Sequence, residues 1–145
     1  MKRRTLLQSI PAVILPPSLW AAANVVRGES DSEATMVYEL RMYQTYPGKL
    51  PDLLTRFREH TMKLFEKHGM KNIAYWTPVD EPKKSNMLIY VLQHASREAA
   101  TASWKAFQED PEWIRVRDKS EENGKIVEKL ESTFMVLTDF SPRLS

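Results

Sequence analysis

The stretch that decides the fold runs from Ser96 to Trp113 and reads Ser-Arg-Glu-Ala-Ala-Thr-Ala-Ser-Trp-Lys-Ala-Phe-Gln-Glu-Asp-Pro-Glu-Trp. Ser96 is a typical helix N-cap, and a stripe of residues recurs behind it at helical spacing: Ala100, Ser103, Trp104 and Phe107. Asp110 can cap a second helix that begins at Pro111. The stretch therefore predicts two consecutive helices. Each carries a tryptophan, and an apolar surface of that size requires a sheet beneath it.

The rest of the chain supplies that sheet and one more helix. Apolar patterns predict strands at residues 36–46, 70–77 and 86–93, and within residues 129–139. A helix is predicted over residues 50–68, with its buried face at positions 50, 53, 54, 57, 61, 64 and 65 and its end at Gly69. The order strand, helix, strand, strand, helix, strand is the split βαβ arrangement. We therefore expect an α+β fold, with a four-stranded antiparallel sheet and both long helices on one face.

Five short motifs, in their order along the chain, resemble those of the NIPSNAP family. They are Tyr38-Glu39-Leu40-Arg41, Pro47-Gly48-Lys49, His68-Gly69 ahead of Trp76, Trp104-Lys105-Ala106-Phe107, and Asp110-Pro111-Glu112-Trp113. The resemblance covers residues 36–139. It implies a ferredoxin-like unit that pairs into a dimeric α/β barrel, and it implies no defined biochemical role. Related dimeric barrels perform monooxygenase, dismutase or isomerase chemistry.

The N-terminus predicts export. A basic start precedes a modest apolar region, which three prolines interrupt and which is too short to span a bilayer. Ala21, Ala22 and Ala23 offer a cleavage site. We therefore expect a signal peptide over residues 1–23, a flexible linker over 24–35, the folded domain over 36–140 and a tail over 141–145. The Arg3-Arg4 pair resembles a twin-arginine signal, and the alternative is an ordinary secretory signal. Both routes lead to the periplasm or the extracellular space.

Charge and cysteine content argue against several classes of function. The whole chain has 21 basic and 19 acidic residues, and loss of Lys2, Arg3 and Arg4 with the signal leaves 18 against 19, a net charge of −1. That balance gives no argument for a nucleic-acid or anionic-membrane partner. The chain has no cysteine, which excludes disulfides and thiolate metal sites.

Familiar catalytic and metal-binding motifs are missing from the sequence. It has no Gly-x-Ser-x-Gly elbow, no His-Glu-x-x-His motif, and only four glycines from which to build a phosphate loop. His60 and His68 lie about 12 Å apart on the predicted helix, so they cannot share a metal. His68 suits a structural role at the negative end of the helix dipole. His94 is either a polar loop residue or a weak candidate for haem binding or proton transfer. We expect no metal and no cofactor.

The best candidates for a small-molecule site alternate along the first predicted strand. Glu39, Arg41 and Tyr43 share one face of it. The opposite face carries Tyr38, Leu40 and Met42 and suits packing beneath the helices. The polar face would then line the interior of a dimeric barrel, where an arginine needs a carboxylate or an anionic ligand. The alternative is a Glu39–Arg41 ion pair that only fixes the dimer.

Three further residues complete the candidate set: His68, Tyr75 and Trp76. The register of the second strand decides whether Tyr75 or Trp76 points into the barrel. All six candidates are ligand-binding candidates, and the sequence assigns no catalytic residue.

The third predicted strand indicates self-association. Met87, Ile89 and Val91 lie on one face and Leu88, Tyr90 and Leu92 on the other, and one layer of helices can bury only one set. We therefore expect a homodimer formed through the sheets. Two functions stay open. The protein binds or transforms a small molecule in the cavity of the dimeric barrel, or it is a non-catalytic interaction module that uses the helix surface around Trp104 and Trp113.

Overall fold

The computed structural model describes residues 36–144, so the predicted signal peptide and the whole of the predicted linker lie outside the described residues. The elements follow in the order β1 (Val37–Thr45), α2 (Leu50–Arg56), η1 (Phe57–Thr61), α3 (Met62–Lys67), β2 (Lys71–Trp76), η2 (Lys83–Ser85), β3 (Met87–His94), α4 (Arg97–Glu109), α5 (Pro111–Ser120) and β4 (Val127–Met135). This confirms the predicted order of strands and helices.

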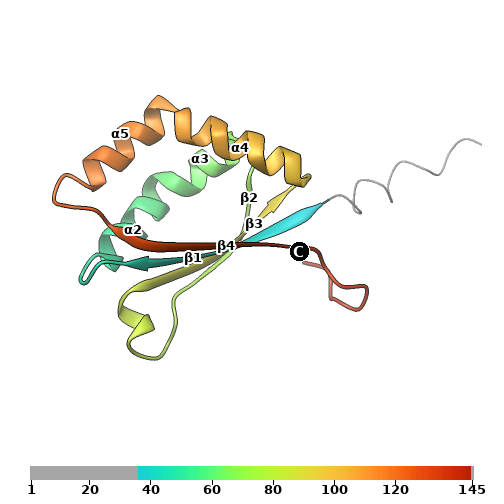
Figure 1. The fold of residues 1–145 in the computed structure, drawn as a ribbon, viewed down its shortest axis with the longest axis horizontal. Helices are drawn as coiled ribbons and strands as arrows, with labels where there is room; N and C mark the ends of the chain where they lie inside the picture. Colours follow the sequence, from blue (N-terminus) through green and yellow to red (C-terminus); the bar gives the residue numbers. More distant parts are fainter. Residues whose placement is uncertain (1–35, 145) are drawn as a thin grey trace, which may run out of the picture.

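The four strands form one antiparallel sheet in the order β2-β3-β1-β4. The long helices lie together on one face of it, as the split βαβ order predicts, and on the opposite side Figure 1 shows loops and the short turn η2. The fold is therefore α+β and ferredoxin-like. Within residues 36–144, no helix has the length and apolar character needed to cross a bilayer.

The helices α4 and α5 begin at the capping residues that the sequence predicts. The Ser96 hydroxyl accepts a hydrogen bond from the Ala99 N–H at 3.0 Å and caps α4. The Asp110 carboxylate accepts from the Glu112 N–H at 2.8 Å and caps α5, whose first residue is Pro111. These two caps set the direction in which each helix runs across the sheet.

The predicted helix over residues 50–68 contains a π-helical segment, η1, between α2 and α3. In a π-helix the backbone N–H groups bond to carbonyls five residues earlier, as the Met62 N–H does to the carbonyl of Phe57, and the Thr61 hydroxyl donates to the carbonyl of Arg56 at 3.2 Å. Phe57 and Thr61 are both buried. The sequence pattern showed one continuous stripe and did not predict this change of pitch.

The fourth strand was predicted too far toward the C-terminus. It begins at Val127 and ends at Met135, while the prediction placed it within residues 129–139. Met135 pairs with Tyr38, and β1 begins at Val37, so a longer strand has nothing to pair with. Val136 and Leu137, which suggested the strand by their apolar character, are exposed.

The predicted orientation of β1 was wrong. In the register with β3, Glu39 pairs with Leu92, Arg41 with Tyr90 and Tyr43 with Leu88. Directly opposed residues share a face, and these three residues of β3 are buried beneath the helices. Glu39, Arg41 and Tyr43 therefore face the helices.

The other set of alternating residues on β1, Tyr38, Leu40 and Met42, faces away from the helices, opposite to the prediction. The sequence comparison of the two faces of β1 ignored β3. On β3, the face that packs beneath the helices is the one with Leu88, Tyr90 and Leu92, and the ring of Tyr90 contacts Phe57 and Phe65. The face with Met87, Ile89 and Val91 is not part of that core. Register with the neighbouring strand decided the face.

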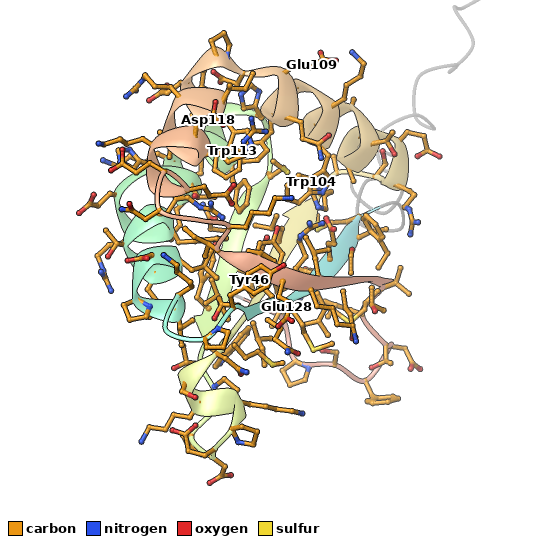
Figure 2. All side chains as sticks on the ribbon, turned by 60° about the vertical axis from the view of Figure 1, so that its left-hand side comes forward. Tyr46, Trp104, Glu109, Trp113, Asp118 and Glu128 are labelled. Atoms are coloured by element: carbon orange, nitrogen blue, oxygen red, sulfur yellow. The ribbon has the colours of Figure 1, made fainter. Side chains whose placement is uncertain are left out.

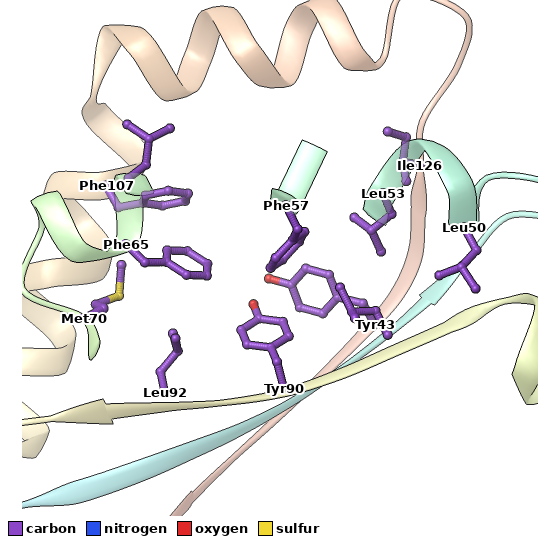
Figure 3. Packing of buried hydrophobic residues seen from close by; sticks show 12 residues of the cluster. Tyr43, Leu50, Leu53, Phe57, Phe65, Met70, Tyr90, Leu92, Phe107 and Ile126 are labelled. Atoms are coloured by element: carbon purple, nitrogen blue, oxygen red, sulfur yellow. The ribbon is translucent and has the colours of Figure 1, made fainter. Parts of the chain in front are cut away.

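The core between sheet and helices is rich in aromatic rings (Figure 3). Tyr43 and Tyr90 meet edge to face with ring centroids 5.3 Å apart, and both contact Phe57 in the same way. Their hydroxyl groups point toward one another beneath Phe57 (Figure 3). Two phenols thus place polar atoms inside an otherwise apolar layer.

Candidate functional site

A buried carboxylate organises the region beneath α4. Glu39 is 1% exposed and accepts hydrogen bonds from three side chains: Trp104 Nε1 at 2.7 Å, Ser132 Oγ at 2.7 Å and the His94 Nε2 position at 2.9 Å. It also forms an ion pair with Arg41. These partners come from β1, β3, β4 and α4, so the carboxylate joins three strands of the sheet to a helix.

The neighbours of Glu39 determine whether its carboxyl group is charged. Burial alone would raise the pKa of Glu39, but the hydrogen bonds from His94, Ser132 and Trp104 and the charge of Arg41 outweigh it and lower the pKa to about 2. Burial alone would lower the pKa of Arg41, yet Tyr43, Tyr90 and Glu39 raise it above its ordinary value. Both groups are therefore charged at neutral pH. The predicted Glu39–Arg41 ion pair is present within one subunit.

Arg41 connects the carboxylate to a phenol. Its guanidinium donates from Nη2 to the Tyr43 hydroxyl oxygen at 3.0 Å and lies 4.1 Å from the centroid of the Trp104 ring. A chain of contacts thus runs from His94 through Glu39 and Arg41 to Tyr43. Tyr43 is the point where this chain reaches a cavity.

Trp104 belongs to the site, although the sequence placed it only in the core. It was expected to pack on the sheet, and its ring lies against Arg41 of β1 and against Phe65 and Phe107 of the helices. Figure 2 shows Trp104 and Trp113 on the side of their helices that faces the sheet. The contact between the indole N–H and a carboxylate was not predicted, because the sequence pattern assigned Glu39 to the opposite face of β1.

His94 is also inside the molecule. It is 1% exposed, its Nε2 position is engaged by Glu39, and its ring lies 6.0 Å from that of Phe134. It is therefore no loop residue. In this conformation its only unpaired nitrogen among the described contacts, Nδ1, is buried.

The other three sequence candidates lie apart from the Glu39 network. His68 follows α3 and pairs with Asp110 at 2.7 Å, which ties α3 to the first turn of α5 and fits the structural role. Tyr75 is on the helix-facing side, stacked on Tyr90 at 5.2 Å, and its hydroxyl donates to Asn72. Trp76 lies on the uncovered face and is 50% exposed. The register therefore places Tyr75, not Trp76, on the face of Arg41.

A cavity of about 180 Å³ opens between α5, η1 and strands β1 and β4. Its aromatic walls are Tyr43, Phe57, Phe107 and Trp113. Its polar lining consists of Thr61, Arg56, Arg117 and Glu121, and Val127 and Leu130 close the side toward β4. A mostly apolar pocket with a few convergent polar groups is the usual form of a small-molecule site.

Arg56 is a site residue that the sequence analysis missed. It is 5% exposed, and its Nη1 donates to Ser120 at 3.2 Å and to Glu121 at 3.5 Å. A signal was available, because Arg56 lies three residues after Leu53 and directly before Phe57, both on the predicted buried face. An arginine beside such an apolar stripe lies either at the solvated edge of the helix or inside the protein, where it needs hydrogen-bond partners.

Metal binding has no support among residues 36–144, where no group of three or more His, Asp or Glu side chains could hold an ion. What the arrangement offers instead is a hydroxyl, guanidinium groups and aromatic rings around a small cavity. Such groups can bind and orient an organic molecule or polarise an oxygen on it.

Comparison with known proteins agrees with the fold. The family model described as NIPSNAP matches residues 38–142. A search of curated proteins found no match. A NIPSNAP-like domain protein from Burkholderia xenovorans superposes with a TM-score of 0.65 at 17% identity, over 77% of this chain and 92% of that chain.

Two further solved structures extend this picture. A NIPSNAP family protein from Agrobacterium tumefaciens gives a TM-score of 0.64 at 23% identity, over 74% of this chain and 97% of that chain. A monooxygenase from Streptomyces coelicolor, in complex with nanaomycin D, gives 0.54 at 13% identity, over 80% of this chain and 99% of that chain. Likeness at these identities shows the fold alone. The family match, in contrast, covers nearly all of the domain that the structure describes, and the chain belongs to the NIPSNAP family.

Proposed function

We propose that the protein binds or transforms a small molecule in the cavity between η1, α5 and β4. The observation that carries the proposal is the position of Tyr43, whose ring lines the cavity while its hydroxyl oxygen accepts from Arg41. This moves the expected site from the space between two sheets to the space between sheet and helices, because Glu39, Arg41 and Tyr43 face the helices.

The Glu39 network supports this proposal by making Tyr43 a fixed donor. Since the phenolic oxygen accepts from a charged guanidinium, its own proton is directed elsewhere, toward Tyr90 or toward a molecule in the cavity. A ligand oxygen placed there would accept a hydrogen bond from Tyr43. The solved Streptomyces monooxygenase holds nanaomycin D on a similar fold, which supports small-molecule binding but carries no reaction over.

The alternative, a non-catalytic interaction module built on exposed indoles, has weaker support. Trp104 and Trp113 are partly buried and pack against the core, Trp113 with its ring 4.5 Å from that of Phe107. The buried charge of Arg41 also favours a site over a filled core, since charges are buried where they are paired and used.

We also propose the setting in which this site works. The protein is exported after cleavage near Ala23, is free of any cofactor, and forms a homodimer through the face of the sheet that no described helix covers. The N-terminal charge pattern supports export, and the apolar residues of that face support the dimer. N-terminal sequencing of the protein from its host should begin near Asn24, and a start at Met1 would refute export.

A fragment screen followed by NMR tests the ligand proposal. The two indole N–H resonances of Trp113 and Trp76 are matched reporters, because Trp113 lines the cavity and Trp76 lies on the opposite face. Small aromatic molecules should shift the Trp113 signal in a saturable manner and leave Trp76 unchanged. Absence of any saturable shift at Trp113, or shifts confined to Trp76, would refute the site.

A further inference from the structure

Two arginines are buried between the sheet and the helices, and their surroundings differ. Arg41 has a carboxylate, a phenol oxygen and an indole ring as partners. Its pKa is raised despite burial, so its neighbours more than compensate the lost water. Arg41 therefore has little need of a further anion, although it was the arginine that the sequence singled out.

Arg56 is the opposite case. Within the described residues its hydrogen bonds run from Nη1 alone, to a serine hydroxyl and to Glu121 at the 3.5 Å limit, and its buried Nε has no partner. Burial lowers its pKa, and Glu121, the largest opposing cause, does not restore it. A guanidinium has five N–H donors, and a buried one short of acceptors gains from any anion that reaches it.

The charges near the cavity leave Arg56 as the arginine that can bind an anion. Arg117 also lines the cavity, but its Nε and Nη2 both bind Asp118, at 3.0 and 2.9 Å, and it is more exposed. Glu121 is the carboxylate nearest to Arg56, and it is a partly exposed residue with a long contact. A ligand carboxylate would compete with Glu121 for the guanidinium rather than with a tight internal pair.

The walls and the size of the cavity define the rest of the ligand. Trp113 lies both on the cavity wall and 5.2 Å beneath the Arg56 guanidinium, so ring contacts and charge meet at one place. An apolar cavity of about 150 Å³ holds one benzene ring. The 180 Å³ here therefore fits one aromatic ring with a small substituent. Arg56 also borders a larger groove of about 350 Å³, but that groove is lined mostly by polar and charged side chains such as Asp52, Glu59 and Lys119, and no Phe, Tyr or Trp lines it.

We propose that Arg56 is the anion-binding residue of the cavity, and that the ligand is a single-ring aromatic carboxylate whose ring lies among Tyr43, Phe57 and Trp113. This deepens the proposed small-molecule function and rests on it. It assigns the ligand-binding charge to an arginine on the helical side and leaves Arg41 as the residue that positions Tyr43.

Calorimetry with three probes on the full mature chain tests the assignment. Benzoate carries ring and charge, benzyl alcohol carries the ring alone, and cyclohexanecarboxylate carries the charge without the aromatic ring. Benzoate should bind about tenfold or more tighter than either of the others, as a charge-assisted hydrogen bond and ring stacking contribute. The Arg56 Nε–H resonance should shift with benzoate and only slightly with benzyl alcohol.

Four variants sharpen the test. Arg56→Met should abolish the preference for benzoate over benzyl alcohol while the alcohol still binds, and Arg58→Met, which removes the same charge from an exposed position of η1, should change neither affinity. Glu121→Gln should tighten benzoate binding, because it removes the competing carboxylate. Arg56→Lys keeps the charge if Arg56→Met does not fold, and it should keep part of the preference.

The outcomes separate the two claims. Benzyl alcohol binding as tightly as benzoate in the wild type, or a preference that survives Arg56→Met, would overturn the role of Arg56 and leave the cavity as a site. No binding of any probe, with no shift at Trp113, would overturn the ligand class and count against the proposed function itself. A neutral ligand found in the cavity by the fragment screen would overturn only the claim that the ligand carries a carboxylate.

Discussion

Trp104 joins packing and polarity in one side chain. Its ring contacts Phe65 and Phe107 and lies against the Arg41 guanidinium, while its N–H donates to Glu39. Trp104→Phe keeps a ring in place but removes the donor to a charged acceptor, so we expect it to cost about 1.5–3 kcal/mol of unfolding free energy. Trp104→Ala also loses the ring and should cost roughly 3–5 kcal/mol. Urea titrations measure both, and an alanine variant losing less than about 1 kcal/mol would contradict the packing.

Glu39 makes stability depend on acid. Its pKa in the folded protein is about 2, against 4.5 for the ordinary group, so the folded state binds this proton more weakly than the unfolded state. Its contribution is complete above pH 4.5 and is lost as pH falls toward 2. By pH 3 the loss should be about 2 kcal/mol relative to pH 6. Urea titrations at the two pH values should show this loss in the wild type and a correspondingly smaller one in Glu39→Gln, and equal losses would refute it.

At the scale of elements, the π-helical segment shapes the cavity. It follows Arg56 and places Phe57 and Thr61 on the cavity wall, and the Thr61 hydroxyl donates a hydrogen bond to the carbonyl of Arg56. Thr61→Val keeps the shape but leaves the carbonyl without this donor, so it should cost about 1 kcal/mol. Thr55→Val, at an exposed position of α2, should cost close to nothing. Thermal unfolding of the pair tests this, and equal midpoints would show that the hydroxyl contributes nothing to the segment.

The elements also show how far a sequence pattern reaches. Capping residues such as Ser96 and Asp110 predicted α4 and α5 well, because caps act over a few residues of chain. The faces of β1 were predicted in reverse, because the burial of Glu39 and Arg41 depends on Leu92 and Tyr90 of another strand. Arg56 was missed because nothing local distinguishes a buried arginine from a solvated one beside an apolar stripe. The face of β1 and the burial of Arg56 thus depend on strand register and on partners far away in the sequence, which a local pattern does not contain.

At the scale of the whole molecule, one face of the sheet is covered by none of the long helices of the described residues (Figure 1). Met42, Met87 and Ile89 line a shallow cavity there, with Trp76 half exposed on the same face. We expect a dimer at micromolar concentration by sedimentation equilibrium, because two such faces bury one another. Ile89→Lys should shift the protein to monomer, and Ile114→Lys, at an exposed position of α5, should not. A wild-type monomer at that concentration would refute the dimer.

The dimer and the ligand site are separable in this account. Residues such as Met42 and Ile89 lie on the face of the sheet opposite to the cavity, and Tyr43 and Arg56 line the cavity on the helix-covered side. A variant that dissociates the dimer should therefore still shift the Trp113 resonance on addition of a fragment. This separation is the main change from the sequence-based expectation, which placed one site between two sheets.

A crystal structure of the protein soaked with benzoate tests the ligand site most directly. We expect density for one planar ring in the cavity bounded by Tyr43, Phe57 and Trp113, with a ligand oxygen within hydrogen-bond distance of Arg56 or of the Tyr43 hydroxyl. Density for the probe only on the exposed face of the sheet, or an empty cavity in a crystal soaked well above the affinity measured by calorimetry, would contradict it.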